Sequence, residues 1–159
     1  EYLKQVGARF DVIQHPYSVT ARQTARVAHA PLEEFAKTVV LKIDGAYAIA
    51  LVPVTRIVDL FEFAHLIGAR SVTLADESEF ATLFPDCEMG AEPPLGTLYQ
   101  LPVYVDRAVA ARDMITFNGG THHEAVRMRY QDFAALVEPT EARFSTYRDS
   151  EGGWYPYAM

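Results

Sequence analysis

Two lysines stand in one of the most apolar parts of the chain, the stretch EEFAKTVVLKIDGAYAIALVP at residues 33–53. Side chains alternate between the two faces of a β-strand, so Lys37 shares a face with Val39 and Leu41, whereas Lys42 lies on the other face. An ammonium group that heads an apolar face either extends to water or has a chemical task. Lys37 is therefore the first candidate for a functional side chain, and a lysine that only reaches solvent is the alternative.

A second candidate is the loop GAEPPLG, which begins at Gly90, ends at Gly96 and contains Pro93 and Pro94. Proline fixes its own φ and disfavours helix for the residue before it, so this loop is expected to be extended and stiff. Gly90 lets the backbone approach a ligand, with an N–H free to donate to a carbonyl or a phosphate. The alternative is a rigid connector between a helix and a strand.

A third candidate is FNGGTHHEA at residues 117–125, which combines two glycines with His122 and His123 at a turn between strands. Adjacent strand residues point to opposite faces, so only one of the two histidines can line a given pocket. A glycine-glycine hairpin with exposed histidines is the alternative. Neither histidine has a partner at the spacing of a helical HExxH or a Cys/His zinc site, so we expect no metal site.

Other catalytic motifs are absent from the sequence. Cys87 is the single cysteine, and a lone cysteine without a motif is usually a small buried apolar residue rather than a nucleophile. There is no Walker loop, no G-x-G-x-x-G and no G-x-S-x-G. We therefore expect no bound cofactor.

The composition describes an ordinary globular chain of 159 residues, half of them hydrophobic and 22% charged. No run approaches the ~18 apolar residues of a membrane span, and no secretory signal opens the sequence. One cysteine excludes an internal disulfide framework and suits a reducing compartment, so we expect a single-domain cytoplasmic protein. The net charge of −7 argues against a sequence-independent DNA or RNA binder, but not against a small site for one end of a nucleic acid.

Hydrophobic periodicity, caps and turns predict a series of short elements. Asp44-Gly45 predicts a hairpin whose second arm is apolar on both faces, so this hairpin is expected to be central and covered on both sides. The acids at residues 76, 77 and 79 are interpreted as helix caps rather than a catalytic pair. The expected strands are 9–15, 36–43, 46–53, 71–74, 102–106, 114–120 and 124–129, and the expected helices are 2–7, 20–30, 59–68, 76–84 and 130–137.

These elements mix without strict βαβ alternation, which predicts an α/β fold. We expect a mixed, mainly antiparallel sheet, curled into a partly open barrel with helices packed outside. One domain is expected over residues 1–139. The aromatic, glycine-containing tail at 140–159 has no clear period, and it either caps the core or forms a dimer contact.

Taken in order, the motifs KTVVLK-DG, VP…VDL, GAEPPLG, VYVD, FNGGTH and VRM resemble the YbaK/EbsC family over residues 10–139. This family is related to the editing insertion domain of bacterial prolyl-tRNA synthetase. The resemblance implies a free-standing aminoacyl-tRNA deacylase, which hydrolyses the ester between a wrong amino acid and the 3′-terminal ribose of a tRNA, commonly tRNA for proline. Its partners would be the aminoacyl-tRNA 3′ end and, as a further possibility, prolyl-tRNA synthetase.

The resemblance also assigns residues. Lys37 matches the essential lysine of the family, Gly90 and Pro94 match its glycine-x-x-x-proline loop, and His122 or His123 occupies a turn where several members place a histidine. It implies catalytic roles for Lys37, Gly90 and His122, with Lys37 holding the terminal phosphate or ribose and amides near Gly90 polarising the ester carbonyl. The substrate-binding residues it implies are Thr38, Pro94, Gly96, Gly120 and His123.

Residues beside Lys37 suggest the amino acid that is removed. Val39, Leu41 and Ile43 share its face, which predicts a small apolar pocket and cleavage of alanine, serine or cysteine esters. Thr38 favours cysteine, because the cysteine-clearing branch of the family carries threonine at this position. A non-catalytic member that binds a tRNA end or a nucleotide is the main alternative, and an interaction module is a weaker one.

Overall fold

Short helices and short strands follow one another through residues 1–147, the part of the chain that the computed structural model describes. The helices are α1 (Tyr2–Gln5), α2 (Ala21–Val27), α3 (Leu60–Ile67), α4 (Glu77–Leu83), α5 (Gly96–Tyr99), α6 (Arg107–Ala110) and α7 (Tyr130–Val137). The strands are β1 (Asp11–Gln14), β2 (Ala36–Ile43), β3 (Ala46–Pro53), β4 (Ile57–Val58), β5 (Val72–Leu74), β6 (Val103–Asp106), β7 (Met114–Asn118), β8 (Glu124–Arg129), β9 (Thr140–Ala142) and β10 (Ser145–Thr146).

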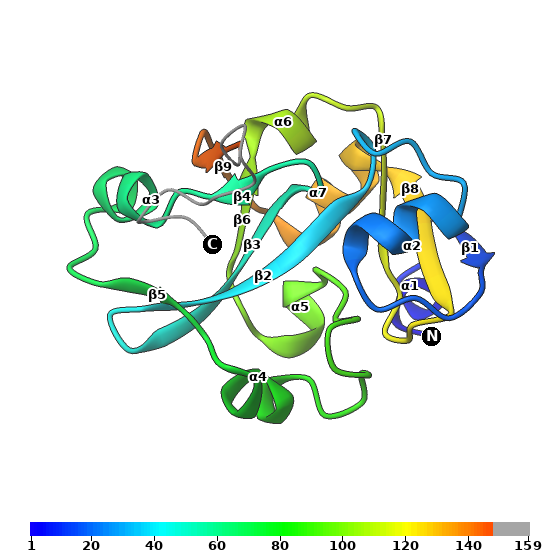
Figure 1. Cartoon of the computed structure of the whole chain (residues 1–159), viewed down its shortest axis with the longest axis horizontal. Helices are drawn as coiled ribbons and strands as arrows, with labels where there is room; N and C mark the ends of the chain where they lie inside the picture. The colour runs from blue at the N-terminus through cyan, green and yellow to red at the C-terminus, as the bar shows by residue number, and fades with distance from the viewer. Residues whose placement is uncertain (148–159) are drawn as a thin grey trace.

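The central unit is a five-stranded sheet of order β5-β2-β3-β6-β9. The predicted hairpin of β2 and β3 is confirmed, and it occupies inner positions of this sheet (Figure 1). Asp44 and Gly45 have φ values of 48° and 88°, the pair of positive angles that a two-residue hairpin turn requires. Register places Lys37 opposite Val52.

A three-stranded sheet of order β1-β8-β7 stands beside the central sheet, and β10 pairs with β4. Five of the seven strand pairs among residues 1–147 are antiparallel, and the two parallel pairs are β3 with β6 and β6 with β9. The expected mixed, mainly antiparallel α/β fold is therefore confirmed. The described strands form separate sheets and no closed barrel, so the predicted partly open barrel is not confirmed.

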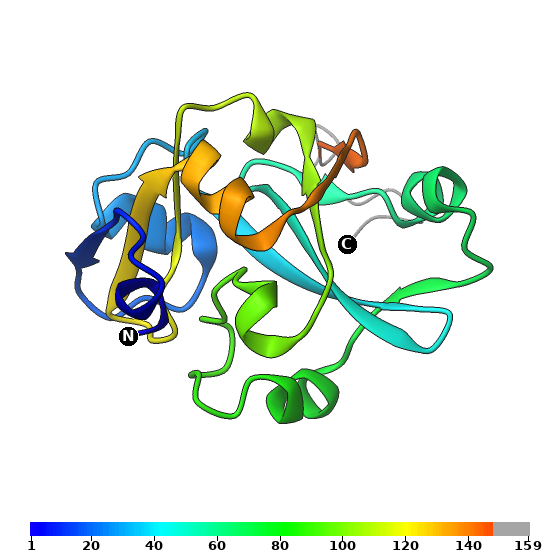
Figure 2. The ribbon, with the colours of Figure 1, turned by 180° about the vertical axis from the view of Figure 1, so that it is seen from behind.

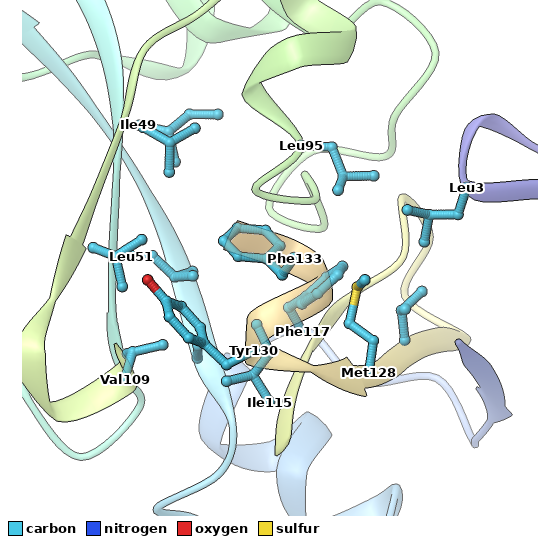
Figure 3. Close-up of a cluster of buried hydrophobic side chains, with 14 of the residues drawn as sticks. Leu3, Ile49, Leu51, Leu95, Val109, Ile115, Phe117, Met128, Tyr130 and Phe133 are labelled. Carbon is cyan, nitrogen blue, oxygen red and sulfur yellow. The ribbon is translucent and has the colours of Figure 1, made fainter. Parts of the chain in front are cut away.

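The hairpin is covered on both faces, as its apolar sequence predicts. One face carries Ile49 and Leu51, which belong to the same core cluster as Phe117 of β7 and Phe133 of α7 (Figure 3). Figure 2 shows α7 and α5 in front of the hairpin on this side. The other face packs on α3 and the C-terminal segment through a second core cluster, whose fully buried members are Leu41, Ala50, Val52, Val58, Phe63 and Phe144.

Helix boundaries follow local capping chemistry. The Thr20 side chain accepts a hydrogen bond from the Gln23 N–H at 3.1 Å, so the predicted cap of α2 is confirmed. The helix ends at Val27, before the predicted end at residue 30, because His29 takes a positive φ of 56° that a helix cannot continue through. At α4, Asp76 and Glu79 form a full capping box, which confirms the interpretation of these acids as caps.

The described part of the predicted tail, residues 140–147, packs on the domain. β9 extends the central sheet beside β6, and β10 pairs with β4. Phe144 between them is 2% exposed and belongs to the second core cluster. Expectations for residues 148–159 lie outside the described residues.

Candidate functional site

Lys37 lies half-buried near the start of β2 and lines a cavity of about 510 Å³. Arg22, in the first turn of α2, and Arg56, just before β4, line the same space. Figure 1 shows α2 beside the start of β2, and β4 near the end of β3, the second strand of the hairpin. Three cationic side chains from separate segments therefore line one cavity, called the Lys37 cavity below.

The Lys37 cavity is suited to an anion. Its described lining contains no aspartate or glutamate, although the chain as a whole has a net charge of −7. Thr20 and Thr55 also lie at its wall. Among residues 1–147, two buried polar atoms at this wall, Thr55 Oγ1 and Arg56 Nε, have no hydrogen-bond partner. An excess of positive charge raises the local concentration of anions.

Lys42 differs from Lys37 as the alternation of strand side chains predicts. Its Nζ lies 2.9 Å from a Glu79 carboxylate oxygen and 5.8 Å from the ring centroid of Tyr47. Hydrogen bonds from Tyr47, from the backbone of Asp76 and from Lys42 lower the pKa of Glu79 to about 2. Lys42 is thus part of a surface ion pair, whereas Lys37 lines the cavity.

The prediction that Val39, Leu41 and Ile43 form the wall of a pocket beside Lys37 is wrong. Leu41 is fully buried, and Val39 and Ile43 pack with it against Phe63 and Phe144. These side chains are core residues, because α3 and the C-terminal segment cover the face on which they lie. An argument for small amino acids therefore cannot rest on them.

A second group of predicted residues meets where residues 88–92 contact residues 118–122, and we call it the loop–turn cluster. The Glu88 N–H donates to the Gly120 carbonyl at 2.8 Å, and the Gly120 N–H donates to the Ala91 carbonyl at 2.9 Å. The His122 N–H donates to a Glu88 carboxylate oxygen at 2.6 Å. The turn between β7 and β8 is thereby held against the proline-containing loop.

The Gly90 N–H is not free, which corrects the sequence interpretation. It donates to Oε2 of Glu92 at 2.8 Å, and Gly90 takes a positive φ of 87°. Glu92 is 7% exposed, and this burial raises the pKa of its carboxyl group, against the opposing effects of the Gly90 N–H and of His122. Sequence reasoning missed Glu92; an acid enclosed between an alanine and two prolines was the available signal.

His122 is the histidine that points inward, and His123 is exposed. His122 Nε2 lies 2.7 Å from the Met89 carbonyl, which can only accept, so Nε2 carries the proton and the Nδ1 of a neutral ring remains an acceptor. The ring of Tyr17 lies 5.4 Å from the His122 ring and 5.5 Å from the His123 ring. The hydrogen bond from Nε2 of His122 therefore stabilises the loop–turn cluster, and only one ring nitrogen takes part in it.

A mainly apolar cavity of about 220 Å³ adjoins the loop–turn cluster, with Pro93, Phe117 and Gly120 in its lining. Cys87 also lines it, and its Sγ lies 3.1 Å from the Tyr99 hydroxyl. Burial raises the pKa of the Cys87 thiol to about 11. The thiol is thus protonated near pH 7 and is not an activated nucleophile.

Four predicted substrate-binding residues do not occur in the described lining of either cavity: Thr38, Pro94, Gly96 and His123. Thr38 lies opposite Leu51, on the face of β2 away from Lys37. Pro94 is buried. A Cβ on Gly96 would lie 2.2 Å from the Leu101 carbonyl oxygen, so close packing explains glycine at position 96 without a ligand.

Residues 15–20 connect the loop–turn cluster to the Lys37 cavity. The His15 N–H donates to the His123 carbonyl at 2.9 Å, and the Ser18 N–H donates to the His122 carbonyl at 3.2 Å. Thr20, two residues after Ser18, lines the Lys37 cavity. Two residues span at most about 7 Å, so this wall of the Lys37 cavity lies next to the turn that holds His122.

Metal and membrane chemistry find no support in the described residues. Residues 1–147 contain no group of three or more His, Cys, Asp and Glu side chains placed to hold a metal ion. None of the helices in that range has the length and apolar character that crossing a membrane requires.

Comparison with known proteins gives the family. The sequence profile of the aminoacyl-tRNA editing domain matches residues 15–136, whereas no curated protein matches the chain. A crystal structure of a proposed trans-editing enzyme for prolyl-tRNA synthetase superposes with a TM-score of 0.80 at 24% identity, over 91% of this chain and 92% of that one. The crystal structure of the hypothetical protein APE2540 gives a TM-score of 0.82 at 18% identity, over 91% and 97%. These likenesses show the fold, and the profile match over most of the chain shows that it belongs to the aminoacyl-tRNA editing domain family, as its YbaK-type motifs predict.

Proposed function

We propose that the chain is a free-standing aminoacyl-tRNA deacylase that clears a tRNA mischarged with a small amino acid. The observation that carries this proposal is the Lys37 cavity, which Lys37 lines together with two arginines, in a chain with an editing domain. The anionic 3′ end of a tRNA is complementary to such a cavity. The first candidate substrate is tRNA for proline, because a structural neighbour is described as acting for prolyl-tRNA synthetase.

The proposed reaction is the hydrolysis of a carboxylic ester. Water adds to the ester carbonyl carbon, the bond from that carbon to the ribose oxygen breaks, and the ribose hydroxyl leaves with a proton while the amino acid is released. Lys37 holds the terminal phosphate or ribose as a point charge, which positions the ester. A hydroxyl of the substrate ribose assists the water, since residues 1–147 offer no activated nucleophile in this region.

The loop–turn cluster has a different role in this proposal. The Gly90 N–H donates to Glu92 and the His122 Nε2–H donates to Met89, so neither reaches the ester carbonyl in this arrangement. The cluster instead shapes the wall beside the ester. His122 Nδ1 is its available acceptor, and it is suited to orient a water molecule or the substrate amino group.

A panel of esters on one proline tRNA tests the function. Alanine, serine, cysteine, proline, leucine and phenylalanine esters are incubated with the protein at concentrations well below those of the substrates, and the released amino acid is measured. We expect release of one or more of the first three and little release of the others, because the mainly apolar cavity of about 220 Å³ beside the loop–turn cluster has room for a small side chain and excludes bulky groups by collision. Preferential release of leucine or phenylalanine would refute the proposal.

One observation favours a second candidate function, a non-catalytic member that binds a tRNA end or a nucleotide. The polar groups expected to act on the ester are engaged within the protein, while the Lys37 cavity keeps its cationic character. Such a member would bind uncharged tRNA and release no amino acid from any ester. The same panel, combined with a binding measurement on uncharged tRNA, distinguishes the two candidates.

A further inference from the structure

The cationic lining of the Lys37 cavity extends beyond the one lysine that the proposed function uses. Arg22 comes from α2 and Arg56 from the segment before β4, and the two are 34 positions apart in the sequence. The cavity volume of about 510 Å³ equals that of about 17 water molecules at about 30 Å³ each. This space exceeds what a single phosphate group fills, so it has room for a larger anionic ligand.

Arginine at these two positions indicates phosphate recognition in particular. A guanidinium group presents its N–H donors in a planar fork that matches two phosphate oxygens, and it is charged at every physiological pH. The described contacts of Arg56 use one nitrogen, Nη1, which donates to Ser145 Oγ at 3.3 Å. The guanidinium therefore has further donors for a ligand.

Tyr147 fixes the direction of Arg56. The guanidinium carbon lies 4.5 Å from the centre of the Tyr147 ring, a cation–π distance. Pairing of β10 with β4 places Tyr147 there, and both β10 and Tyr147 lie beyond the residues that match the editing domain. A segment outside the matched domain thus completes the wall of the cavity and limits the freedom of one of its arginines.

We propose that Arg22 and Arg56 bind a second backbone phosphate of an RNA strand, adjacent to the phosphate that Lys37 holds, and that Tyr147 is a positioning residue for Arg56. This inference rests on the proposed function for the identity of the strand, a tRNA 3′ end. It makes the ligand of the cavity a polynucleotide end rather than a mononucleotide. It also explains how a chain with a net charge of −7 holds RNA at one small place.

The experiment measures binding of the full chain to an uncharged RNA hairpin that ends in CCA, and to adenosine 5′-monophosphate, over a range of salt concentrations. We expect Arg22→Gln and Arg56→Gln each to weaken hairpin binding about threefold to tenfold and to reduce the slope of log K against log salt by about 0.7, the value for one phosphate contact on a single strand. Binding of the monophosphate should remain unchanged in both variants. Arg26→Gln, on the same helix and outside the described lining, is the matched control and should change neither ligand's affinity.

Two results would overturn the inference. Unchanged hairpin affinity and salt slope in both variants would mean that the arginines do not meet RNA. An equal loss of hairpin and monophosphate binding would mean that all three cations share one phosphate. Circular dichroism and thermal unfolding of each variant separate a binding defect from a folding defect.

Tyr147 is tested by a conservative pair. Tyr147→Phe keeps the ring under the guanidinium and should bind the hairpin like the unmodified chain, whereas Tyr147→Ala should weaken hairpin binding by about twofold to threefold. The Tyr147→Ala loss should disappear in an Arg56→Gln background, because the ring acts through that arginine. A loss that persists in that background would contradict the positioning role.

Failure of this inference is distinguishable from failure of the proposed function. A protein that releases amino acids but shows wild-type salt slopes in both arginine variants is a deacylase without the second phosphate contact. A protein that releases nothing but shows the expected slopes binds an RNA end without catalysis, and the inference then holds for the second candidate function.

Discussion

The Lys37 cavity and the loop–turn cluster contain most of the residues that the sequence singled out, and they use polar groups in opposite ways. In the loop–turn cluster, the N–H groups of Gly90, Gly120 and His122 all donate to acceptors within the protein. In the Lys37 cavity, two buried polar atoms have no partner among residues 1–147, and no carboxylate occurs in the described lining. Asn118 Oδ1 is an exception in the turn, since this buried atom has no partner among residues 1–147. A region whose N–H groups are paired internally maintains a shape, whereas excess positive charge in the described lining of a cavity attracts an anionic ligand.

The largest effect on the deacylation rate is expected from a change in the Lys37 cavity. Lys37→Met should lower kcat/KM for the best ester by on the order of 100-fold, because loss of an anchoring charge misplaces the reacting ester. The melting temperature should change little. Single-turnover deacylation and thermal unfolding measure the two effects.

Lys42→Met is the matched control for Lys37, since it removes the same charge from the other face of the same strand and ends the ion pair with Glu79. It should leave the deacylation rate unchanged. An active Lys37→Met protein beside an inactive Lys42→Met protein would reverse the assignment of the two faces.

The next effect concerns folding at the end of the proline-containing loop. Gly96→Ala introduces a Cβ 2.2 Å from the Leu101 carbonyl oxygen and 2.4 Å from Val103 Cγ2, and backbone cannot yield as a flexible side chain does. We expect the free energy of unfolding to fall by about 3 kcal/mol. Chemical denaturation measures it, and a change below about 0.5 kcal/mol would show that α5 shifts to make room.

A smaller effect is expected at the other glycine of the loop. Gly90 has a φ of 87°, and a Cβ there would meet His122 Cε1 at 3.6 Å, an ordinary contact distance. Gly90→Ala should therefore cost about 1–2 kcal/mol of stability through backbone strain alone. It should also lower the deacylation rate if the loop shapes the site. A fully active variant would reduce the loop to a connector.

The smallest effect tests whether the charge of Glu92 matters to the loop–turn cluster. Burial raises the pKa of Glu92, so the folded chain holds this proton more tightly than the unfolded chain does. Stability contributed by this group is therefore greatest below the ordinary glutamate pKa and is lost as pH rises through the raised value. Glu92→Gln keeps an acceptor for the Gly90 N–H without the charge, so it should raise the melting temperature by a few degrees at pH 7 and not at pH 4.

Thermal unfolding of Glu92→Gln between pH 4 and pH 8 checks this expectation. A lower melting temperature at pH 7 would show that the charged hydrogen bond to Gly90 outweighs the cost of burying the carboxylate. The loop would then depend on that charge for its shape.

The hairpin and the helix starts were predictable from the sequence because they depend on neighbouring residues. Asp44-Gly45 forms the turn, Thr20 caps α2, and Asp76 with Glu79 caps α4, all through contacts within a few positions. The separation of Lys37 from Lys42 follows from strand alternation alone. The family could likewise be recognised from the order of its motifs without a structure, and the profile match confirms that family.

What only the tertiary structure decided is which polar groups meet across long sequence separations. The hydrogen bond that Arg56 donates to Ser145 spans 89 positions. The group of cations around Lys37 forms because α2, β2 and the segment before β4 converge. The donation of the Gly90 N–H to Glu92 spans only two positions, yet it depends on a buried loop conformation that no local pattern specifies. Local chemistry determines where helices and strands begin and turn, whereas the charge and the free hydrogen-bonding capacity of a cavity are set by packing between distant segments.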